Sequence, residues 1–321
     1  MNTPLVTIIT PSYNQASYLE QTIQSVLAQE YPNLEYMIVD GGSTDGSVEI
    51  IRKYADKLAW WVSEKDSGQA EAINKGFARA TGELVAWLNS DDLYQPGMIA
   101  TSVEALQAHP EAGLVYGDVL SINGAGQPIN LMTFAPYTLE DLMAFQYISQ
   151  PGVMMRRSVL QQAGFLDVNF DYLLDHQLWL RMARLAGMVY IHRQQAVARF
   201  HAAAKNLAHT SRYGDDAARV ATWLESKPEY SANFDRRKVW AGANRINGWY
   251  LVEGSHPAEA LRAYYQSFKL RPRTALADWR RILYALLSLA GLSRLKPAFY
   301  GLRSGIRRRT RPDIYAAEPK K

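Results

Sequence analysis

Two short polar stretches of this sequence carry side chains that could bind a ligand. Asp40-Gly41-Gly42-Ser43-Thr44-Asp45-Gly46-Ser47 combines glycines, hydroxyls and two carboxylates, and Asn89-Ser90-Asp91-Asp92 places two carboxylates side by side. Neither stretch follows the glycine-rich, lysine-containing patterns with which proteins cradle a phosphate directly. Carboxylates suit other contacts, namely base N–H groups, ribose hydroxyls, or a phosphate that is reached through a divalent cation.

Each stretch also has a plainer interpretation. Asp40 could accept a hydrogen bond from a donor such as the N3–H of uracil, or it could belong only to a tight turn and a helix N-cap. Asp91 and Asp92 repel each other unless a bound Mg²⁺ or Mn²⁺ offsets that repulsion. They could equally be acidic residues at a helix N-terminus before Pro96. The residue types alone leave these alternatives open.

The apolar pattern predicts that strands and helices alternate around these stretches. Leu5 to Thr10 is nearly continuous apolar and β-branched, as in a strand buried on both faces, and Ser17-x-x-Glu20 is typical of a capping box. Further strands are predicted at Glu35 to Val39, Ala59 to Val62, Glu83 to Leu88 and Leu114 to Val119, and helices at Ser47 to Tyr54, Gln69 to Ala80 and Pro96 to His109. This order indicates a parallel sheet with helices on both faces, in which ligands bind at the carboxyl ends of the strands.

Four separated blocks of the chain resemble family 2 glycosyltransferases of the GT-A fold, and they occur in the family's order. They are VTIITPSYNQASYLEQTIQSVLAQEYPNLEYMIVDGGSTDGS, SEKDSGQAEAINKGFARATGELVAWLNSDD, ISQPGVMMRRSVLQQAGFLD and DHQLWLRMA. This large group of inverting enzymes builds bacterial surface polysaccharides. The resemblance implies an α/β, Rossmann-like fold with a mostly parallel sheet over residues 1–207.

The resemblance assigns the donor site to four residues. Pro11 and Tyr13 would form the walls around the nucleobase, and Asp40 would pair with it. Asp66 lies in the loop that closes over the nucleotide. The implied donor is a nucleotide diphosphate sugar, with UDP as the expected nucleotide.

The resemblance also implies a metal site and a catalytic base. Asp91 would reach the ribose or the metal, and Asp92 would bind the Mn²⁺ or Mg²⁺ that bridges the diphosphate. His201 matches a histidine that supports the metal or diphosphate in some members, although a buried structural histidine is equally compatible. Asp175 matches the catalytic aspartate, with His176 as the neighbouring alternative and a plain helix N-cap as the structural one. A single base without an enzyme nucleophile implies one displacement and inversion at the anomeric carbon.

Two classes of function are therefore considered. The first is an inverting, metal-dependent hexosyltransferase that transfers a sugar to a hydroxyl of a cell-surface glycan or a lipid-linked acceptor. The second is a non-catalytic scaffold that keeps the nucleotide-sugar fold and binds partners. The intact carboxylates favour the enzyme, and no motif in the region from Met132 to Ser149 identifies the acceptor.

Strand signals stop after about Leu207, which predicts a C-terminal all-helical extension over residues 208–300. Within it, residues 237–272 show the spacing of a single tetratricopeptide-like helical hairpin. Residues 301–321 are expected to form a basic, disordered tail.

Charge is distributed unevenly along the chain. The net charge is +4, yet Lys269 to Lys321 contains 14 basic and 3 acidic residues. An apolar helical stripe that starts at Trp279 precedes the basic run, so residues 279–311 could bind an anionic membrane surface, or the stripe could pack on the hairpin. Nucleic acid is not expected as a partner, because the basic run lacks interleaved aromatic residues.

Composition excludes several other classes. The chain has no cysteine, which rules out disulfides, thiolate metal sites and a thiol nucleophile. The longest apolar run, Ile282 to Leu292, is too short to span a bilayer, and the N-terminus has no signal-peptide pattern. A cytoplasmic location, with possible peripheral binding to the inner face of the cell membrane, is therefore expected.

Overall fold

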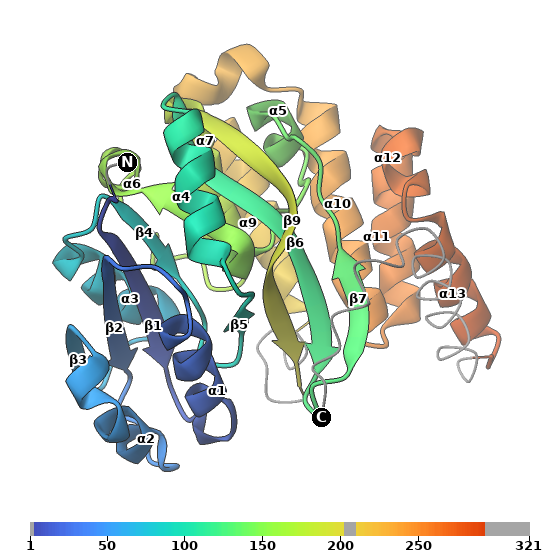
Figure 1. Ribbon diagram of the computed structural model, residues 1–321. Helices are drawn as coiled ribbons and strands as arrows, with labels where there is room; N and C mark the ends of the chain where they lie inside the picture. Colours follow the sequence, from blue (N-terminus) through green and yellow to red (C-terminus); the bar gives the residue numbers. More distant parts are fainter. Residues whose placement is uncertain (1–2, 202–209, 293–321) are drawn as a thin grey trace.

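A curled mixed sheet forms the centre of the computed structural model, which describes residues 3–201 and 210–292 (Figure 1). Within these ranges nine strands form one sheet in the order β3-β2-β1-β4-β8-β6-β9-β5, with β7 paired to β6. The strands are β1 (Val6–Ser12), β2 (Leu34–Asp40), β3 (Trp60–Ser63), β4 (Leu84–Trp87), β5 (Leu93–Tyr94), β6 (Ala112–Asn123), β7 (Pro128–Met132), β8 (Val153–Arg156) and β9 (Gly187–Phe200).

The two halves of the sheet differ in strand direction. Strands β3, β2, β1 and β4 run parallel to one another, as the alternating pattern predicts. In the other half β8 is antiparallel to both β4 and β6, whereas the long strands β6 and β9 are parallel. Periodicity gives no strand direction, so the mixed half could not be read from the sequence.

Helices cover both faces of the sheet. They are α1 (Ala16–Leu27), α2 (Ser47–Lys53), α3 (Gln69–Arg79), α4 (Met98–Ala108), α5 (Leu139–Met143), α6 (Arg157–Ala163) and α7 (Leu174–Leu185). Ile8 of β1 packs in a core with α1, α2 and α4, whereas its neighbour Ile9 packs in a core with α3 and α7. Both faces of β1 are thus buried, which is why its sequence is continuously apolar.

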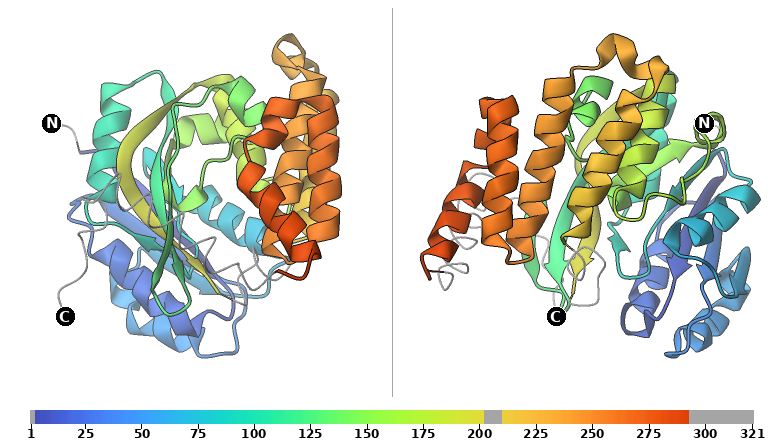
Figure 2. Two further views of the ribbon diagram at one scale, coloured as in Figure 1. Left: turned by 90° about the vertical axis from the view of Figure 1, so that its right-hand side faces the viewer. Right: turned by 180° about the vertical axis from the view of Figure 1, so that it is seen from behind.

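The C-terminal part is helical, as predicted, and packs beside the sheet (Figure 2). It comprises α9 (Arg212–Glu225), α10 (Arg236–Glu253), α11 (Pro257–Leu270), α12 (Pro272–Leu276) and α13 (Trp279–Leu289). Helices α10 and α11 form the predicted hairpin, and a Cβ built on Gly248 would lie 2.9 Å from the Tyr264 ring. That close approach explains the glycine, because any side chain there would push the two helices apart.

The boundary predicted at residue 207 and the basic tail predicted at 301–321 lie outside the described residues, as do Arg294 and Lys296 before the tail. Among residues 3–201 and 210–292, no helix has the length and apolarity needed to cross a membrane.

Candidate active site

A single large cleft lies along the carboxyl ends of the parallel strands. Its volume is about 1120 Å³, and it is lined by six of the eight predicted site residues, namely Pro11, Tyr13, Asp66, Asp91, Asp92 and Asp175. The strand tips meet here because β1 pairs with both β2 and β4 in parallel register. Tyr13 is 62% exposed, so its ring is available for stacking, and Pro11 lines the same cleft.

Asp40 is fully buried beneath the turn that follows β2 and is not among the described residues that line the cleft. Its Oδ2 accepts hydrogen bonds from the backbone N–H groups of Gly42 (3.1 Å) and Ser43 (2.9 Å), and from the Ser63 hydroxyl (2.7 Å). Its Oδ1 accepts from the Ser43 hydroxyl at 2.5 Å. The carboxylate therefore organises the turn, which is the plainer of its two interpretations.

The second carboxylate of this turn, Asp45, holds the neighbouring helix. Its Oδ2 accepts from the N–H of Ala16 (2.9 Å), and the Ser47 hydroxyl accepts from the N–H of Gln15 (3.0 Å). Helix α1 is thus capped by side chains about 30 residues away in sequence, in the manner of an N-cap. The predicted Ser17 capping box is wrong, because Ser17 lies inside the helix and Gln15 is the N-cap residue.

Asp66 follows β3 and lies at the cleft wall against Gly41. Its Oδ1 accepts from the N–H of Gly68 at 2.9 Å, and a Cβ built on Gly41 would lie 2.7 Å from its Oδ2. Burial raises the pKa of this carboxyl above its ordinary value. The structure thus places Asp66, rather than Asp40, at the surface of the cleft beside Tyr13.

Asp91 and His201 are far apart in the sequence but are in contact in the fold. The Nε2 of His201, after β9, lies 3.0 Å from the Oδ2 of Asp91, after β4. The ring of Tyr18 packs on His201 with centroids 4.6 Å apart, and the Arg199 guanidinium lies over the same Tyr18 ring. His201 is therefore held as a hydrogen-bond partner of the cleft-lining Asp91 and is not itself among the described residues that line the cleft.

Asp92 is turned further inward than Asp91. Its Oδ1 accepts from the N–H of Arg199 at 2.9 Å, which ties the tip of β4 to β9. Burial, and the neighbouring Asp91, raise the pKa of Asp92 well above its ordinary value. The two adjacent carboxylates thus have different environments, and Asp91 is the one that pairs with a second potential ligand.

The residues present fit a hard divalent cation that is shared with a ligand. Carboxylate and imidazole are ordinary ligands of Mn²⁺, and Mg²⁺ is usually bound by one or two carboxylates plus substrate phosphates. Within residues 3–201 and 210–292, no group of three or more His, Asp or Glu side chains is placed to hold a metal ion by itself. Asp91 and His201 could therefore supply only part of a coordination sphere.

Asp175 lies in the first turn of α7 and faces the cleft. The Tyr147 hydroxyl donates to its Oδ2 (2.8 Å), and the N–H of His176 donates to its Oδ1 (2.7 Å). Helix α7 is fixed to the sheet by Trp179, whose ring stacks on Trp87 of β4 with centroids 5.4 Å apart. This packing orients Asp175 toward the same cleft as Asp91.

His176 points away from the cleft. Its ring is buried and stacks on Phe145 with centroids 5.2 Å apart. Burial lowers the pKa of His176 to about 4, so the imidazole is neutral at physiological pH. The geometry therefore favours Asp175 over His176 as a base.

The cleft also contains residues that no sequence motif identified. Tyr147 lines it, and the helical extension contributes Arg245, Trp249 and Tyr250 from α10 and Arg281 from α13. The ring of Trp249 lies under the Arg281 guanidinium at 4.5 Å. No motif marks these positions, and the residues of α10 and α13 reach the cleft only because the helical extension packs beside the sheet.

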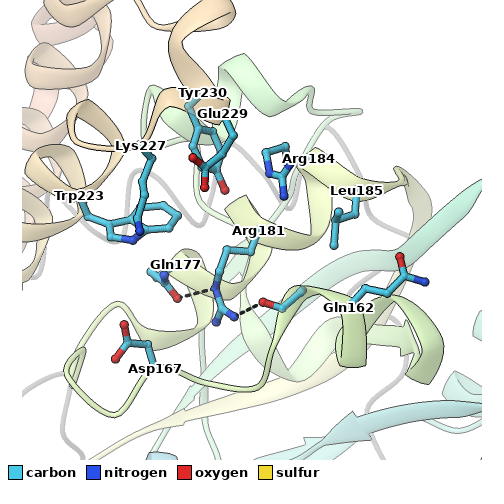
Figure 3. Close-up of a pocket in the computed structure, with 11 residues that line it drawn as sticks. Gln162, Asp167, Gln177, Arg181, Arg184, Leu185, Trp223, Lys227, Glu229 and Tyr230 are labelled. Atoms are coloured by element: carbon cyan, nitrogen blue, oxygen red, sulfur yellow. Dashed lines mark hydrogen bonds between the residues drawn. The ribbon is translucent and has the colours of Figure 1, made fainter.

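A second, smaller pocket of about 240 Å³ lies along α7 (Figure 3). Arg181 of α7 crosses it and donates to Gln177 Oε1 (3.0 Å) and to the carbonyl oxygens of Ala163 (2.5 Å) and Phe165 (2.7 Å). These bonds fasten the end of α6 to α7. The pocket therefore helps to hold the helix that presents Asp175.

Comparison with known proteins identifies the family. The sequence profile described as Glycosyl transferase family 2 matches residues 7–164. TuaG of Bacillus subtilis, whose name places it in teichuronic acid biosynthesis, is 33% identical over 193 residues, which cover 58% of this chain and 75% of TuaG. The chain belongs to glycosyl transferase family 2. A further relative, the uncharacterized glycosyltransferase alr2836 of Nostoc sp., is 28% identical over 303 residues, 81% of this chain and 92% of its own.

Solved structures confirm the predicted GT-A fold class of this family 2 glycosyltransferase. S. aureus TarS 1-349 in complex with UDP-GlcNAc superimposes with a TM-score of 0.58 at 16% identity, covering 94% of this chain and 92% of that one. The mannosyltransferase PcManGT from Pyrobaculum calidifontis, in complex with GDP-Man and Mn²⁺, gives 0.60 at 21% identity, covering 90% and 87%. The chain spans 53% of a longer TarS chain.

Proposed function

We propose that this family 2 glycosyltransferase is an inverting, metal-dependent hexosyltransferase that uses a UDP-sugar. The acceptor is a hydroxyl of a cell-surface glycan or of a lipid-linked saccharide. The observation that carries the proposal is that Asp91 and Asp175 line one cleft, although they come from different elements. The complexes of TarS with UDP-GlcNAc and of PcManGT with GDP-Man and Mn²⁺ support a nucleotide-sugar donor and a divalent cation.

On the donor side, Tyr13 and Pro11 would enclose the base, and Asp91 with His201 would hold Mn²⁺ or Mg²⁺. The cation would supply stabilisation of the negative charge that develops on the departing diphosphate. Asp92 would support Asp91 by tying the tip of β4 to the N–H of Arg199.

On the acceptor side, Asp175 would accept the proton of the attacking hydroxyl. The Tyr147 hydroxyl holds one carboxylate oxygen and the His176 N–H holds the other, so the carboxylate orientation is fixed before substrate binds. One displacement with no enzyme nucleophile inverts the anomeric carbon. Trp249 and Tyr250 would help to form the wall against which the acceptor sugar lies, since both line the cleft.

Nucleotide release tests this proposal. The full chain is incubated with a panel of UDP-sugars and saccharide acceptors, with Mn²⁺ or with EDTA. We expect UDP release with at least one donor in Mn²⁺, and loss of that release in EDTA. If the chain neither bound a nucleotide nor turned over any donor, that result would contradict the proposal and favour the scaffold.

The extension also carries a candidate membrane-binding face on α13. Trp279, Leu283 and Leu286 share one side of the helix and are 54%, 43% and 51% exposed, whereas Tyr284 and Ala285 pack on the α10–α11 hairpin. Three residues of the predicted apolar stripe are thus exposed, while the side of α13 that carries Tyr284 and Ala285 packs on the hairpin. The basic sequence from Arg294 to Arg311, which lies outside the described residues, follows directly and would favour an anionic surface.

Vesicle co-sedimentation tests this face. The Leu283→Glu/Leu286→Glu variant should bind phosphatidylglycerol-containing vesicles about 10-fold or more weakly than the unchanged protein, because two leucine side chains no longer enter the lipid interface. Val168→Glu, at an exposed position before α7, is the matched control and should bind normally. Equal sedimentation of all three proteins would remove the membrane proposal.

A further inference from the structure

Two carboxylates near the tip of β2, Asp40 and Asp66, are candidates for recognising the nucleobase of the donor. The inference rests on the proposed function, because it concerns the nucleotide of that donor. The strand-tip carboxylate Asp40 is the residue that sequence resemblance assigns to the base. The structure gives that carboxylate four hydrogen-bond donors from Gly42, Ser43 and Ser63, with no exposed surface. To reach a base, Asp40 would have to give up the bonds that shape its own turn.

Gly41 makes room for a different carboxylate. The Oδ2 of Asp66 lies 2.7 Å from the position that a Cβ on Gly41 would occupy, which is closer than real Cβ contacts allow. Gly41 does not have a positive φ, so its backbone does not require glycine. The absence of a side chain at position 41 is therefore what admits Asp66 to the cleft wall.

The position of Asp66 relative to Tyr13 suits the edge of a base. The N–H of Gly41 donates to the carbonyl oxygen of Ser12 at 2.8 Å, so Gly41 and Tyr13 leave neighbouring strands side by side. Asp66, lying against Gly41, therefore lines the cleft near the point where Tyr13 leaves β1, and the exposed Tyr13 lines the same cleft. A base that stacks on this ring would present its edge to Asp66.

The two oxygens of Asp66 have different roles. Oδ1 accepts from the N–H of Gly68 and so holds the loop that follows β3. Oδ2 receives no hydrogen bond from any donor within residues 3–201 and 210–292. An ionised carboxylate oxygen only accepts hydrogen bonds, so it matches a ring N–H and is mismatched to a ring nitrogen lone pair. Uracil has such an N3–H, whereas N3 of cytosine is an acceptor.

We propose that Asp66, and not Asp40, recognises the nucleobase by accepting the N3–H of uracil, and that Gly41 is required to admit it. Asp66 is then the residue that makes the protein prefer uridine nucleotides to cytidine nucleotides. Base recognition can be distinguished from a structural role of Asp66 in the loop. Oδ2 would bind the base, whereas Oδ1 binds the N–H of Gly68.

Calorimetric titration of the full chain with UDP, CDP and GDP in Mn²⁺ tests the assignment. The unchanged protein should bind UDP more tightly than CDP, because N3 of cytosine has no proton to donate to the carboxylate. Asp66→Asn keeps the Oδ1 acceptor for Gly68 but turns Oδ2 into a donor, so UDP affinity should fall about 10- to 100-fold and the preference for UDP over CDP should shrink or reverse. Gly41→Ala should also weaken UDP binding, because its Cβ displaces the Asp66 carboxylate.

Glu64→Gln is the matched control. It removes a carboxylate from the same loop, on a residue that pairs with Lys75 at 3.1 Å and is not among the described residues lining the cleft, so the UDP preference should stay unchanged. An unchanged preference in Asp66→Asn would overturn this assignment and leave the proposed function standing. A preference for GDP in the unchanged protein would overturn the choice of uracil. Failure of the unchanged protein to bind any nucleotide would overturn both the assignment and the proposed function.

Discussion

Asp175→Asn is expected to lower the rate of sugar transfer by about 10³-fold while leaving UDP binding within about twofold of the unchanged protein. Asparagine has the shape of aspartate but cannot take a proton from the attacking hydroxyl. The donor should still bind, because Pro11, Tyr13 and Asp91 lie on other elements of the cleft. The measurement is single-turnover transfer at saturating donor, beside a calorimetric titration with UDP.

A neighbouring carboxylate provides the control for this loss. Asp167 lies in the loop before α7, where it accepts from the N–H of Asn169 at 2.9 Å, and it lines the pocket along α7 and not the cleft. Asp167→Asn should retain most of the transfer activity. Retention of more than about a tenth of the rate by Asp175→Asn would mean that another group accepts the proton.

Asp91→Asn is expected to have the second largest effect, lowering both Mn²⁺ affinity in the presence of UDP and transfer by about 100-fold or more. The reason is its pairing with His201 at 3.0 Å, which marks it as the carboxylate that shares a cation with a second ligand. Electron paramagnetic resonance of Mn²⁺ with UDP present measures the affinity without any acceptor. His201→Ala should lower the same affinity.

Asp92→Asn distinguishes the two adjacent carboxylates. Its Oδ1 accepts from the N–H of Arg199, and asparagine can keep that bond, so the loss of Mn²⁺ affinity should be smaller than in Asp91→Asn. The opposite order, with Asp92→Asn the more damaging change, would make Asp92 the cation ligand and Asp91 its support.

The parallel half of the fold was predictable because its signals are local. Strand β1 packs on both faces through Ile8 and Ile9, and this shows directly as a continuous apolar run. Signals that depend on distant residues were not predictable. Helix α1 is capped by Asp45 and Ser47, which follow β2, so the local Ser17-x-x-Glu20 pattern predicted the wrong N-cap. The antiparallel position of β8 between β4 and β6 likewise depends on tertiary pairing.

The candidate site shows the same division between local and distant information. The strand-tip carboxylates Asp91 and Asp92 could be found from the sequence because they follow an apolar run directly. Which of the two meets His201 depends on β9, more than 100 residues later. The presence of Trp249 in the cleft depends on how the extension packs, and no residue spacing encodes it.

The central claim is that a cation-bound diphosphate at Asp91 and the base Asp175 face one sugar across a shared cleft. A crystal structure of the full chain with Mn²⁺ and a UDP-sugar tests it most directly, since manganese is located by anomalous scattering. We predict manganese in contact with Asp91, His201 and the diphosphate, with the anomeric carbon on the side that faces the Asp175 carboxylate. Manganese bound away from Asp91 and His201, or a sugar whose anomeric carbon is turned from Asp175, would contradict the account.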